Sequence, residues 1–331
     1  MKYQVYGIGN ALVDAEFEVN EEFLNSKGIE KGMMTLIDEE QQLSLVNDLN
    51  AQFGLKKRAG GGSAANTLVS ISQLGGKTFY ACKVANDETG DFYMNDLAKA
   101  GVDTNLDQVK TKGVTGKCIV MVTDDAERTM NTFLGITADF AEADLHLEEM
   151  KNSEYIYIEG YLVTSDVSRN AAIHARKIAK QHGVKTAFTF SDPAMVTYFK
   201  EGVAEIINDG VDVLFANEEE ALTYSGKDSL DEAIKELSKI TSKLVITLGN
   251  KGARIINGNG TENIEPVKVE AVDTNGAGDM FAGAFMYGLT HGFSDLQAGN
   301  LASESAANIV TVFGARLDKQ VQQDILQKYI S

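Results

Sequence analysis

The sequence predicts an α/β protein whose mostly parallel sheet is covered by helices on both faces and carries a small β lid. In the second half of the chain, apolar runs of strand length alternate with helical stretches. The runs lie at 155–159, 185–190, 211–215 and 243–248, and the helical stretches lie near 165–182, 195–208 and 217–239. Strands that alternate with helices of this length form βαβ units, whose parallel sheets are buried on both faces.

The remaining elements extend this pattern toward both ends of the chain. Strands are expected at 3–9, 33–37, 78–84, 253–256 and 262–269, and helices at 39–53, 68–74, 88–100 and from 276 onward, with two more before the end. The chain has two prolines, no repeats and no low-complexity linker, so we expect residues 1–331 to form one domain.

Two stretches interrupt the alternation of strands and helices. The runs at 117–123 and 128–134 flank the polar turn Asp124-Asp-Ala-Glu, which predicts a β-hairpin. The pattern between 15 and 37 is mixed and short. We therefore expect segments near 15–37 and 113–134 to form the lid.

Composition excludes several classes of partner. A net charge of −18 argues against nucleic acid or an anionic membrane as the main partner. No apolar run reaches membrane-spanning length, and no signal-peptide core follows the N-terminus. Two cysteines, and four histidines without metal-ligand spacing, fit a reducing compartment. We expect a soluble, cytoplasmic protein that must supply positive potential locally if it binds phosphates.

The segment Asp273-Thr-Asn-Gly-Ala-Gly-Asp279 opens a helix that is apolar all round. The backbone N–H groups of Gly276, Ala277 and Gly278 have no helical partners and can approach an anion. Asp279 follows them, and a carboxylate beside a phosphate site suits a base that deprotonates an attacking hydroxyl. This pattern predicts phosphoryl transfer. Two other interpretations stay open, an Asp that complements the helix dipole and glycines that permit close packing.

A second glycine-rich entry to a helix, Gly60-Gly-Gly-Ser-Ala-Ala-Asn-Thr67, predicts another close-approach site. Gly61 and Gly62 leave room for a ligand, Ser63 is placed to cap the helix, and Asn66 offers both a donor and an acceptor. A flexible turn with an N-cap is the alternative interpretation.

Three further motifs follow strand ends or lie in the hairpin. Asn217 and Glu220, three apart on one helix face, are candidates to hold Mg²⁺ through water, with Glu220 the metal-side carboxylate. A solvated helix start is the alternative. Thr247, Gly249 and Gly252 suit a loop beneath the phosphates or ribose of a nucleotide, although an ordinary turn looks the same.

Arg128 lies in the hairpin, where a surface position is the default interpretation. On a closing lid its guanidinium would neutralise the transferred phosphoryl group.

Four of these motifs, in this order, resemble the PfkB, or ribokinase-like, carbohydrate kinases. Asp273-Thr-Asn-Gly-Ala-Gly-Asp279 resembles the second signature of that family and Gly61-Gly-Ser-Ala-Ala-Asn66 the first, while Asn217-x-x-Glu220 and Thr247-x-Gly249-x-x-Gly252 match two further motifs. The resemblance spans nearly the whole chain. It implies ATP-dependent phosphorylation of an alcohol with Mg²⁺, Asp279 as the base, and the 276–278 backbone as the anion hole.

Within that family, Gly7-Ile-Gly-Asn-Ala-Leu-Val-Asp14 looks most like the adenosine kinase branch, in which the matching Asn10 and Asp14 hold ribose hydroxyls. The resemblance then implies transfer to the 5′-hydroxyl of a nucleoside, with adenosine as the first choice and purine salvage as the role. Leu134 and Leu162, together with Leu12 and Ile37, are candidates for an apolar slot around the base, with core packing as the alternative. Asn308 is placed with the expected ATP-binding residues, and a monovalent cation is a further candidate cofactor.

Several alternatives remain at this stage. A sugar kinase of the same family would act on ribose, fructose or 2-keto-3-deoxygluconate, and a non-catalytic sensor would bind nucleoside or ATP without needing Asp279. A dinucleotide-dependent oxidoreductase is disfavoured, because Leu12 stands where the third glycine of the fingerprint belongs. A P-loop and a hydrolase nucleophile elbow are absent from the sequence. The sequence is compatible with a monomer or a homodimer.

Overall fold

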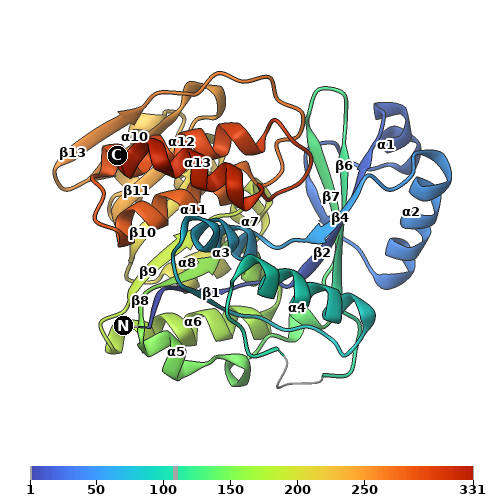
Figure 1. The fold of residues 1–331 in the computed structure, drawn as a ribbon, viewed down its shortest axis with the longest axis horizontal. Coiled ribbons are helices and arrows are strands. Elements are labelled where there is room, and N and C mark those ends of the chain that lie inside the picture. The colour runs from blue at the N-terminus through green and yellow to red at the C-terminus, as the bar shows by residue number, and fades with distance from the viewer. Residues whose placement is uncertain (1, 107–110, 331) are drawn as a thin grey trace.

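The main body is built on an eight-stranded sheet (Figure 1). The structure is a computed structural model that describes residues 2–106 and 111–330. Six neighbouring strands are parallel, and the last two are antiparallel. In spatial order the strands are β13 (Gly260–Ile264), β12 (Ala253–Asn257), β11 (Thr241–Thr247), β10 (Val211–Asn217), β9 (Lys185–Thr189), β8 (Ser153–Glu159), β1 (Tyr3–Ile8) and β5 (Thr78–Ala81).

Helices cover both faces of this sheet, which confirms the predicted α/β class. The strands are apolar on both sides, so that Tyr155 and Tyr157 of β8 face one hydrophobic cluster while Ile156 and Ile158 face the other. The first cluster packs against α3 (Ser63–Leu74), α4 (Glu88–Ala100), α11 (Ala277–Thr290), α12 (Asp295–Ile309) and α13 (Lys319–Ile330). The second packs against α5 (Leu147–Lys151), α6 (Asp166–Gln181), α7 (Pro193–Tyr198), α8 (Lys200–Ile207), α9 (Glu218–Ser225) and α10 (Leu230–Leu237). Within the described ranges, no helix is both long and apolar enough to cross a membrane.

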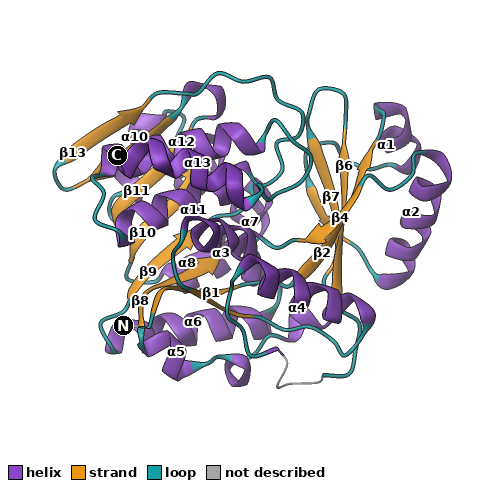
Figure 2. Cartoon of the chain, in the orientation of Figure 1, coloured by secondary structure: helices purple, strands orange, loops and turns teal. Residues whose placement is uncertain are grey.

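A five-stranded sheet stands beside the main body, with two helices on its outer face (Figure 2). Its spatial order is β3 (Met34–Leu36), β7 (Arg128–Phe133), β6 (Gly116–Val122), β2 (Leu12–Glu18) and β4 (Lys57–Gly60), and the helices are α1 (Glu21–Lys27) and α2 (Glu39–Gln52). Phe17, Ile119 and Met121 of the sheet pack against Phe23 and Leu49 of the helices. The segments near 15–37 and 113–134 supply strands here, together with β4, and their action as a lid stays a prediction.

The inner face of the five-stranded sheet turns toward the main body. Side chains alternate between the two faces of a strand, so residues paired across the ladders form rows on one face. One row consists of Asp14, Cys118, Thr132 and Leu36, and the next of Glu16, Val120, Met130 and Met34. The inner face thus changes from carboxylates on β2 to apolar and sulfur-containing side chains on β7 and β3.

The observed elements differ from the expected ones in four places. The helix expected at 217–239 is two helices, because Gly226 ends α9 in the left-handed conformation with φ of 65°. The helix expected at 195–208 is also two, separated at Phe199. The strand expected at 262–269 ends at Ile264, and the sequence did not indicate β2, α1 or β4.

Candidate active site

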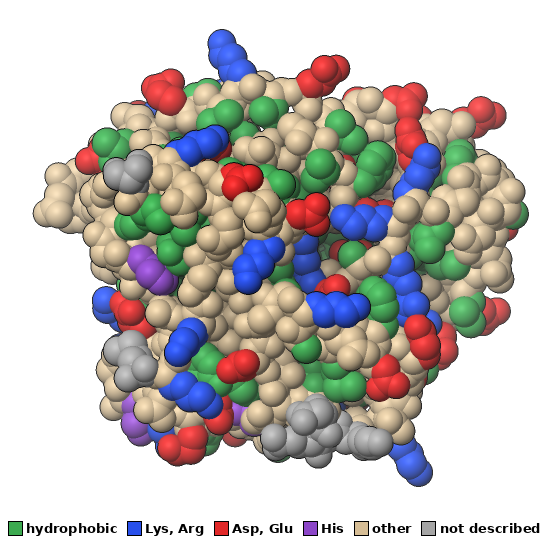
Figure 3. Space-filling view, in the orientation of Figure 1, with side chains coloured by type: hydrophobic (Ala, Val, Ile, Leu, Met, Phe, Trp, Pro, Cys, Tyr) green, Lys and Arg blue, Asp and Glu red, His purple; other side chains and the backbone are tan. Residues whose placement is uncertain are grey.

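A cavity lies between the inner face of the five-stranded sheet and the carboxyl ends of the parallel strands. Polar groups at the ends of β1, β8 and β9, the entry to α3 and the N-terminus of α11 form one wall. Open α/β sheets bind ligands at this edge. The space-filling view is hollowed between the two parts of the molecule, and Lys and Arg side chains lie around the hollow (Figure 3). Asp and Glu side chains lie among them, so the rim of the hollow carries charges of both signs.

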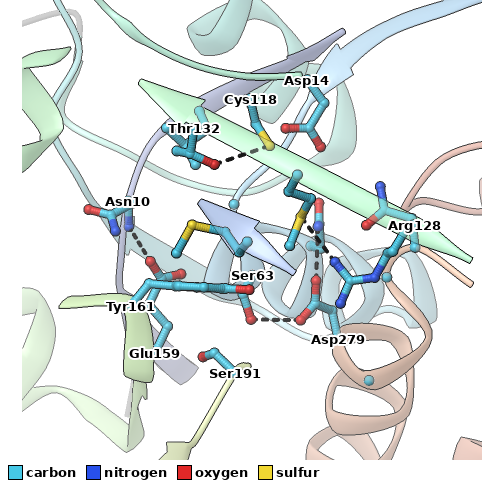
Figure 4. A pocket seen from close by; sticks show the side chains of 18 of the residues that line it. Asn10, Asp14, Ser63, Cys118, Arg128, Thr132, Glu159, Tyr161, Ser191 and Asp279 are labelled. Atoms are coloured by element: carbon cyan, nitrogen blue, oxygen red, sulfur yellow. Dashed lines mark hydrogen bonds between the residues drawn. The ribbon is translucent and has the colours of Figure 1, made fainter. Parts of the chain in front are cut away.

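Asp279 lies at the centre of this cavity, in the first turn of α11 (Figure 4). Its Oδ1 accepts a hydrogen bond of 2.6 Å from Ser63 Oγ, and its Oδ2 accepts one of 3.0 Å from Asn66 Nδ2. Burial raises the pKa of Asp279, while these two hydrogen bonds and the charges of Arg128 and Arg316 oppose the rise. The carboxylate is thus oriented from one side and open to the cavity on the other.

Ser63 therefore does not cap its helix, and that expectation was wrong. Glu159, at the end of β8, takes over the capping, because its Oε2 accepts the N–H of Ala64 at 2.8 Å and its Oε1 that of Asn10 at 2.6 Å. Burial raises the pKa of Glu159 to about 8. The sequence analysis missed this residue, although its position at a strand end was a usable signal.

The two glycines before Asp279 differ in what surrounds them, and their role in an anion hole stays a prediction. Gly276 is the N-cap of α11 with φ of 74°, and a Cβ there would lie 2.6 Å from Ala315 Cα. A Cβ on Gly278, by contrast, would meet no heavy atom within 4 Å. Protein packing therefore explains the glycine at 276, whereas the space beside Gly278 is open for a ligand.

Asp14 lies on the β2 side of the cavity and is buried. Within the described chain no group donates a hydrogen bond to its carboxylate, and a Cβ on Gly61 would overlap it. Burial and the nearby Glu16 raise the pKa of Asp14 to about 8. Asn10 lines the same cavity; its Oδ1 accepts a 3.4 Å hydrogen bond from Thr137 Oγ1, and its Nδ2 has no hydrogen-bond partner among the described residues. Both side chains have polar atoms ready for a ligand.

The β3 and β7 side of the cavity is mainly apolar, with Arg128 and Thr132 as its polar residues. Leu134 lines it as expected, together with Met34, Leu36, Met130 and Tyr161. Leu162 does not reach the cavity: it is fully buried in the core cluster on the face of the main sheet that α6 covers. The residue before it, Tyr161, lines the cavity in its place and donates a 3.2 Å hydrogen bond to Asp192 Oδ2.

Arg128 lies beside Asp279 in the close-up (Figure 4). Its guanidinium donates a 3.0 Å hydrogen bond to the sulfur of Met130, and within the described residues it forms no ion pair. A guanidinium without a carboxylate partner at the mouth of an anion hole is available for a phosphate group.

A second cavity lies on the other side of the α11 N-terminus. Thr247, Gly249 and Gly252 line it as expected, and Ala277 and Gly278 form the wall that it shares with the N-terminus of α11. Its other walls come from the loop 266–271 and from Ser303, Ala306, Ala307 and Val310 of α12, which the sequence analysis did not single out. Gly278 lines both cavities.

Asn308 is not among these residues. Its amide donates a 2.9 Å hydrogen bond to the backbone oxygen of Glu304, one helical turn earlier on α12. Asn308 does not lie on the face of α12 that lines the second cavity. The expectation that Asn308 lies with the ATP-binding residues is therefore corrected.

Asn217 and Glu220 bind each other at the start of α9. Asn217 Oδ1 accepts the N–H of Glu220 at 2.7 Å, and Glu220 Oε2 accepts the N–H of Asn217 at 2.8 Å, which is a capping box. Burial raises the pKa of Glu220 to about 8. Among the described residues no group of three or more His, Cys, Asp or Glu could hold a metal ion. Asn217 and Glu220 therefore fit only a Mg²⁺ ion that is held mainly by phosphate oxygens and that these two side chains contact through water.

A half-buried carboxylate held by two hydrogen bonds, and two cavities that meet at Gly278, suit a group-transfer enzyme with two substrates. The model of the pfkB family carbohydrate kinases matches residues 30–322, and the chain belongs to this family. It is accordingly an ATP-dependent phosphotransferase, as the four motifs predicted. This result sets aside the sensor and oxidoreductase interpretations.

Two relatives and one crystal structure show which members of the family resemble this chain. The chain is 30% identical to the adenosine kinase of Saccharomyces cerevisiae over 306 residues, which cover 86% of this chain and 88% of the relative. It is 27% identical to the ribokinase of Staphylococcus aureus over 281 residues, covering 82% and 88%. The crystal structure of adenosine kinase from Sinorhizobium meliloti superposes with a TM-score of 0.93 at 32% identity and covers 99% of both chains. These likenesses confirm the ribokinase-like fold.

Proposed function

We propose that the protein phosphorylates the 5′-hydroxyl of a nucleoside, with adenosine as the first choice. One observation carries the proposal: within the described residues, the cavity around Asp279 has the unpaired carboxylate of Asp14 at its β2 side and mainly apolar side chains at its β7 and β3 side, where Arg128 and Thr132 are the polar residues. A nucleoside has the same two-part character, a hydroxylated ring joined to a flat base. The adenosine kinases among the relatives support this assignment.

The dimensions of the inner face support an acceptor with two parts. The row from Asp14 to Leu36 crosses three strand-to-strand spacings, or roughly 14 Å. Asp14 and Asn10 at one end would bind the vicinal ribose hydroxyls, the carboxylate accepting two hydrogen bonds. Met34 and Tyr161 at the other end would contact the base, for which apolar and aromatic surfaces are suited.

Asp279 would act as the base for the attacking hydroxyl. Its two hydrogen bonds from Ser63 and Asn66 fix the carboxylate plane and leave lone pairs facing the cavity. As the 5′-oxygen forms a bond to the γ-phosphorus, the bond to the ADP oxygen breaks and the hydroxyl proton passes to Asp279. A fixed base in contact with the hydroxyl needs no reorganisation during this step.

Charge on the transferred group would be borne by the 276–278 backbone and by Arg128. Gly278 borders the open space at the N-terminus of α11, where its N–H would meet the anion and the helix dipole would add to the effect, while the Ala277 N–H donates a 3.3 Å hydrogen bond to Thr274 O. Mg²⁺, bound with ATP and reached through water from Asn217 and Glu220, would neutralise part of the phosphate charge. Thr247, Gly249 and Gly252 would hold the nucleotide in the second cavity.

Closure of the five-stranded sheet over the main body would exclude water from the reaction. Both cavity walls are needed to enclose the acceptor, since Asp14 and Arg128 come from the sheet and Asp279 from the main body. Closure then occurs only when both substrates are present, which prevents transfer of the phosphoryl group to water.

The test is an acceptor panel with Mg²⁺ and ATP, in which ADP formation and the mass of the product are measured. The panel contains adenosine, inosine, guanosine, cytidine, ribose, fructose and 2-keto-3-deoxygluconate, with K⁺ and Na⁺ compared. We expect a nucleoside 5′-monophosphate as the product and little turnover of free sugars. The matched compound 5′-deoxyadenosine should inhibit without being phosphorylated. Preference for a free sugar would keep Asp279 as the base and overturn the nucleoside assignment in favour of a sugar kinase.

A further inference from the structure

Arg316, outside all the recognised motifs, lies directly behind Asp279. Its side chain is 12% exposed, and its Nε donates a 2.8 Å hydrogen bond to Asn66 Oδ1. Its Nη1 is paired with Asp96 of α4, and its Nη2 is buried without a partner among the described residues. Asn66 in turn donates its Nδ2 to Asp279 Oδ2. A chain of hydrogen bonds therefore runs from the guanidinium through one amide to the base.

The guanidinium determines which way the Asn66 amide points. An arginine side chain carries donors only, so the amide atom that faces Arg316 must be the oxygen. The amide nitrogen then faces Asp279 and donates to it. In the flipped orientation the Asn66 oxygen would face the carboxylate, and two acceptors would repel each other. A residue that cannot accept a hydrogen bond thus selects the one productive orientation.

We propose that Arg316 is a positioning residue for the base, acting through Asn66 to hold the Asp279 carboxylate in the orientation that accepts the proton of the acceptor hydroxyl. This inference rests on the proposed function of Asp279. Arg316 itself touches neither cavity, so it acts without contacting either substrate.

The backbone around Arg316 is fixed to the same helix start. Gly314 N–H donates a 2.9 Å hydrogen bond to Asp273 Oδ2, and Ala315 packs against Gly276, the N-cap of α11. Leu317 accepts a 2.9 Å hydrogen bond from Gln73 of α3. Segment 313–317 therefore keeps the guanidinium in register with the two helices that carry Asn66 and Asp279.

The charge of Arg316 acts in the same direction as its hydrogen bond. Burial raises the pKa of Asp279, and the Arg316 charge opposes that rise. The other charged or titratable groups that face Asp279 are Arg128 from β7, Asp14 from β2, and Glu159, Tyr157 and Tyr161 from β8 and the turn that follows it. The Arg316 guanidinium thus adds to Arg128 in opposing the rise that burial causes in the pKa of Asp279.

The experiment compares Arg316→Met with Asp96→Asn in steady-state kinetics over pH 5–9, on the intact protein. Arg316→Met removes the donor and the charge, so we expect kcat to fall about 10- to 100-fold while both KM values stay within about 3-fold. The acid limb of the kcat profile should move to higher pH, because the pKa of the base rises. Asp96→Asn keeps Arg316 in contact with Asn66 and should retain kcat within about 3-fold.

Two outcomes would overturn the proposal. One is a folded Arg316→Met protein with wild-type kcat and an unmoved acid limb, and the other is an Asp96→Asn protein with the full loss. If Arg316→Met does not fold, Arg316→Lys decides: the charge remains but the Nε geometry is lost, so kcat should fall with the acid limb unmoved, and wild-type kcat would refute positioning. The wild-type protein and Asp279→Asn, measured together, report separately on the proposed function.

Discussion

The two cavities that meet at Gly278 are lined by different kinds of residue. The acceptor cavity contains the carboxylates Asp14, Glu159 and Asp279 and the guanidinium of Arg128. The second cavity is lined mainly by glycine, alanine, valine and hydroxyl-bearing residues, with Lys268 as the charged residue among those that line it. Under the proposed assignment, the difference teaches that recognition of the acceptor would depend on individual side chains, whereas nucleotide binding would depend mainly on backbone groups and small residues.

We expect the largest loss of activity from a change at Asp279. Asp279→Asn removes the base while keeping the shape of the side chain, so we expect turnover to fall by about 10²–10⁴-fold. Calorimetry should find the affinities for ATP and nucleoside largely intact, because neither cavity loses a wall. Turnover near that of the wild type would remove Asp279 from its role.

A change at Asp14 should weaken binding in the first cavity and leave binding in the second cavity unchanged. Asp14→Ala removes a buried hydrogen-bond acceptor that has no partner among the described residues. We expect the nucleoside KM to rise about 10- to 100-fold, which corresponds to the loss of hydrogen bonds to a charged group. The ATP KM should not change. Glu16→Gln is the matched control, since Glu16 is a buried carboxylate two residues further on the same strand but does not line the cavity. An unchanged nucleoside affinity in Asp14→Ala would refute the ribose assignment.

The two glycines of the anion hole should respond in opposite ways. Gly278→Ala puts a methyl group into open space within a helix, so the thermal midpoint should hold or rise, while kcat/KM for ATP falls about 10-fold or more. Gly276→Ala should lower the midpoint, because φ of 74° and contact with Ala315 both penalise a Cβ. Equal thermal midpoints for the two variants, measured by calorimetry, would contradict this distinction.

The smallest effect concerns stability and pH. Burial raises the pKa of Asp14 to about 8 in the folded protein, above the value of an exposed Asp. The folded state therefore binds this proton more tightly than the unfolded state, and the stability it contributes is lost as the pH rises toward 8. Asp14→Asn removes the titration. Its thermal midpoint should exceed that of the wild type by an amount that grows from pH 5 to pH 8, and a constant difference would argue against a raised pKa.

The sequence predicted the catalytic motifs better than the surfaces around them. Asp279, Ser63 and Asn66 lie in motifs whose glycines and helix starts dictate local geometry, and the structure brings them together. The strand β2 was missed although Val13, Ala15 and Phe17 alternate with Asp14, Glu16 and Glu18, the period-two pattern of a strand with one apolar face. Its apolar face packs against the outer helices, and its polar face carries Asp14 to the cavity.

The other misses depend on long-range packing. Tyr161 rather than Leu162 lines the cavity, because the chain after β8 forms a short 3₁₀ helix that buries Leu162 and Val163 in the core. Asn308 lies a fraction of a helical turn away from the face of α12 that lines the second cavity. Arg316 is 250 residues from its partner Asn66, and no local pattern connects them. Such contacts follow from the fold as a whole.

The strand β3 is three residues long, lies at the edge of its sheet, and is hydrogen-bonded to β7 alone. Met34 and Leu36, at the far end of the cavity, thus belong to the shortest strand, which is paired on one side, while Asp14 lies on a strand paired on both sides and Asp279 on a helix packed against α3 and α12. Evolution can therefore exchange the group recognised at that end in small steps without disturbing the transfer chemistry. A family with one reaction and many acceptors is what such a division of constraint would produce.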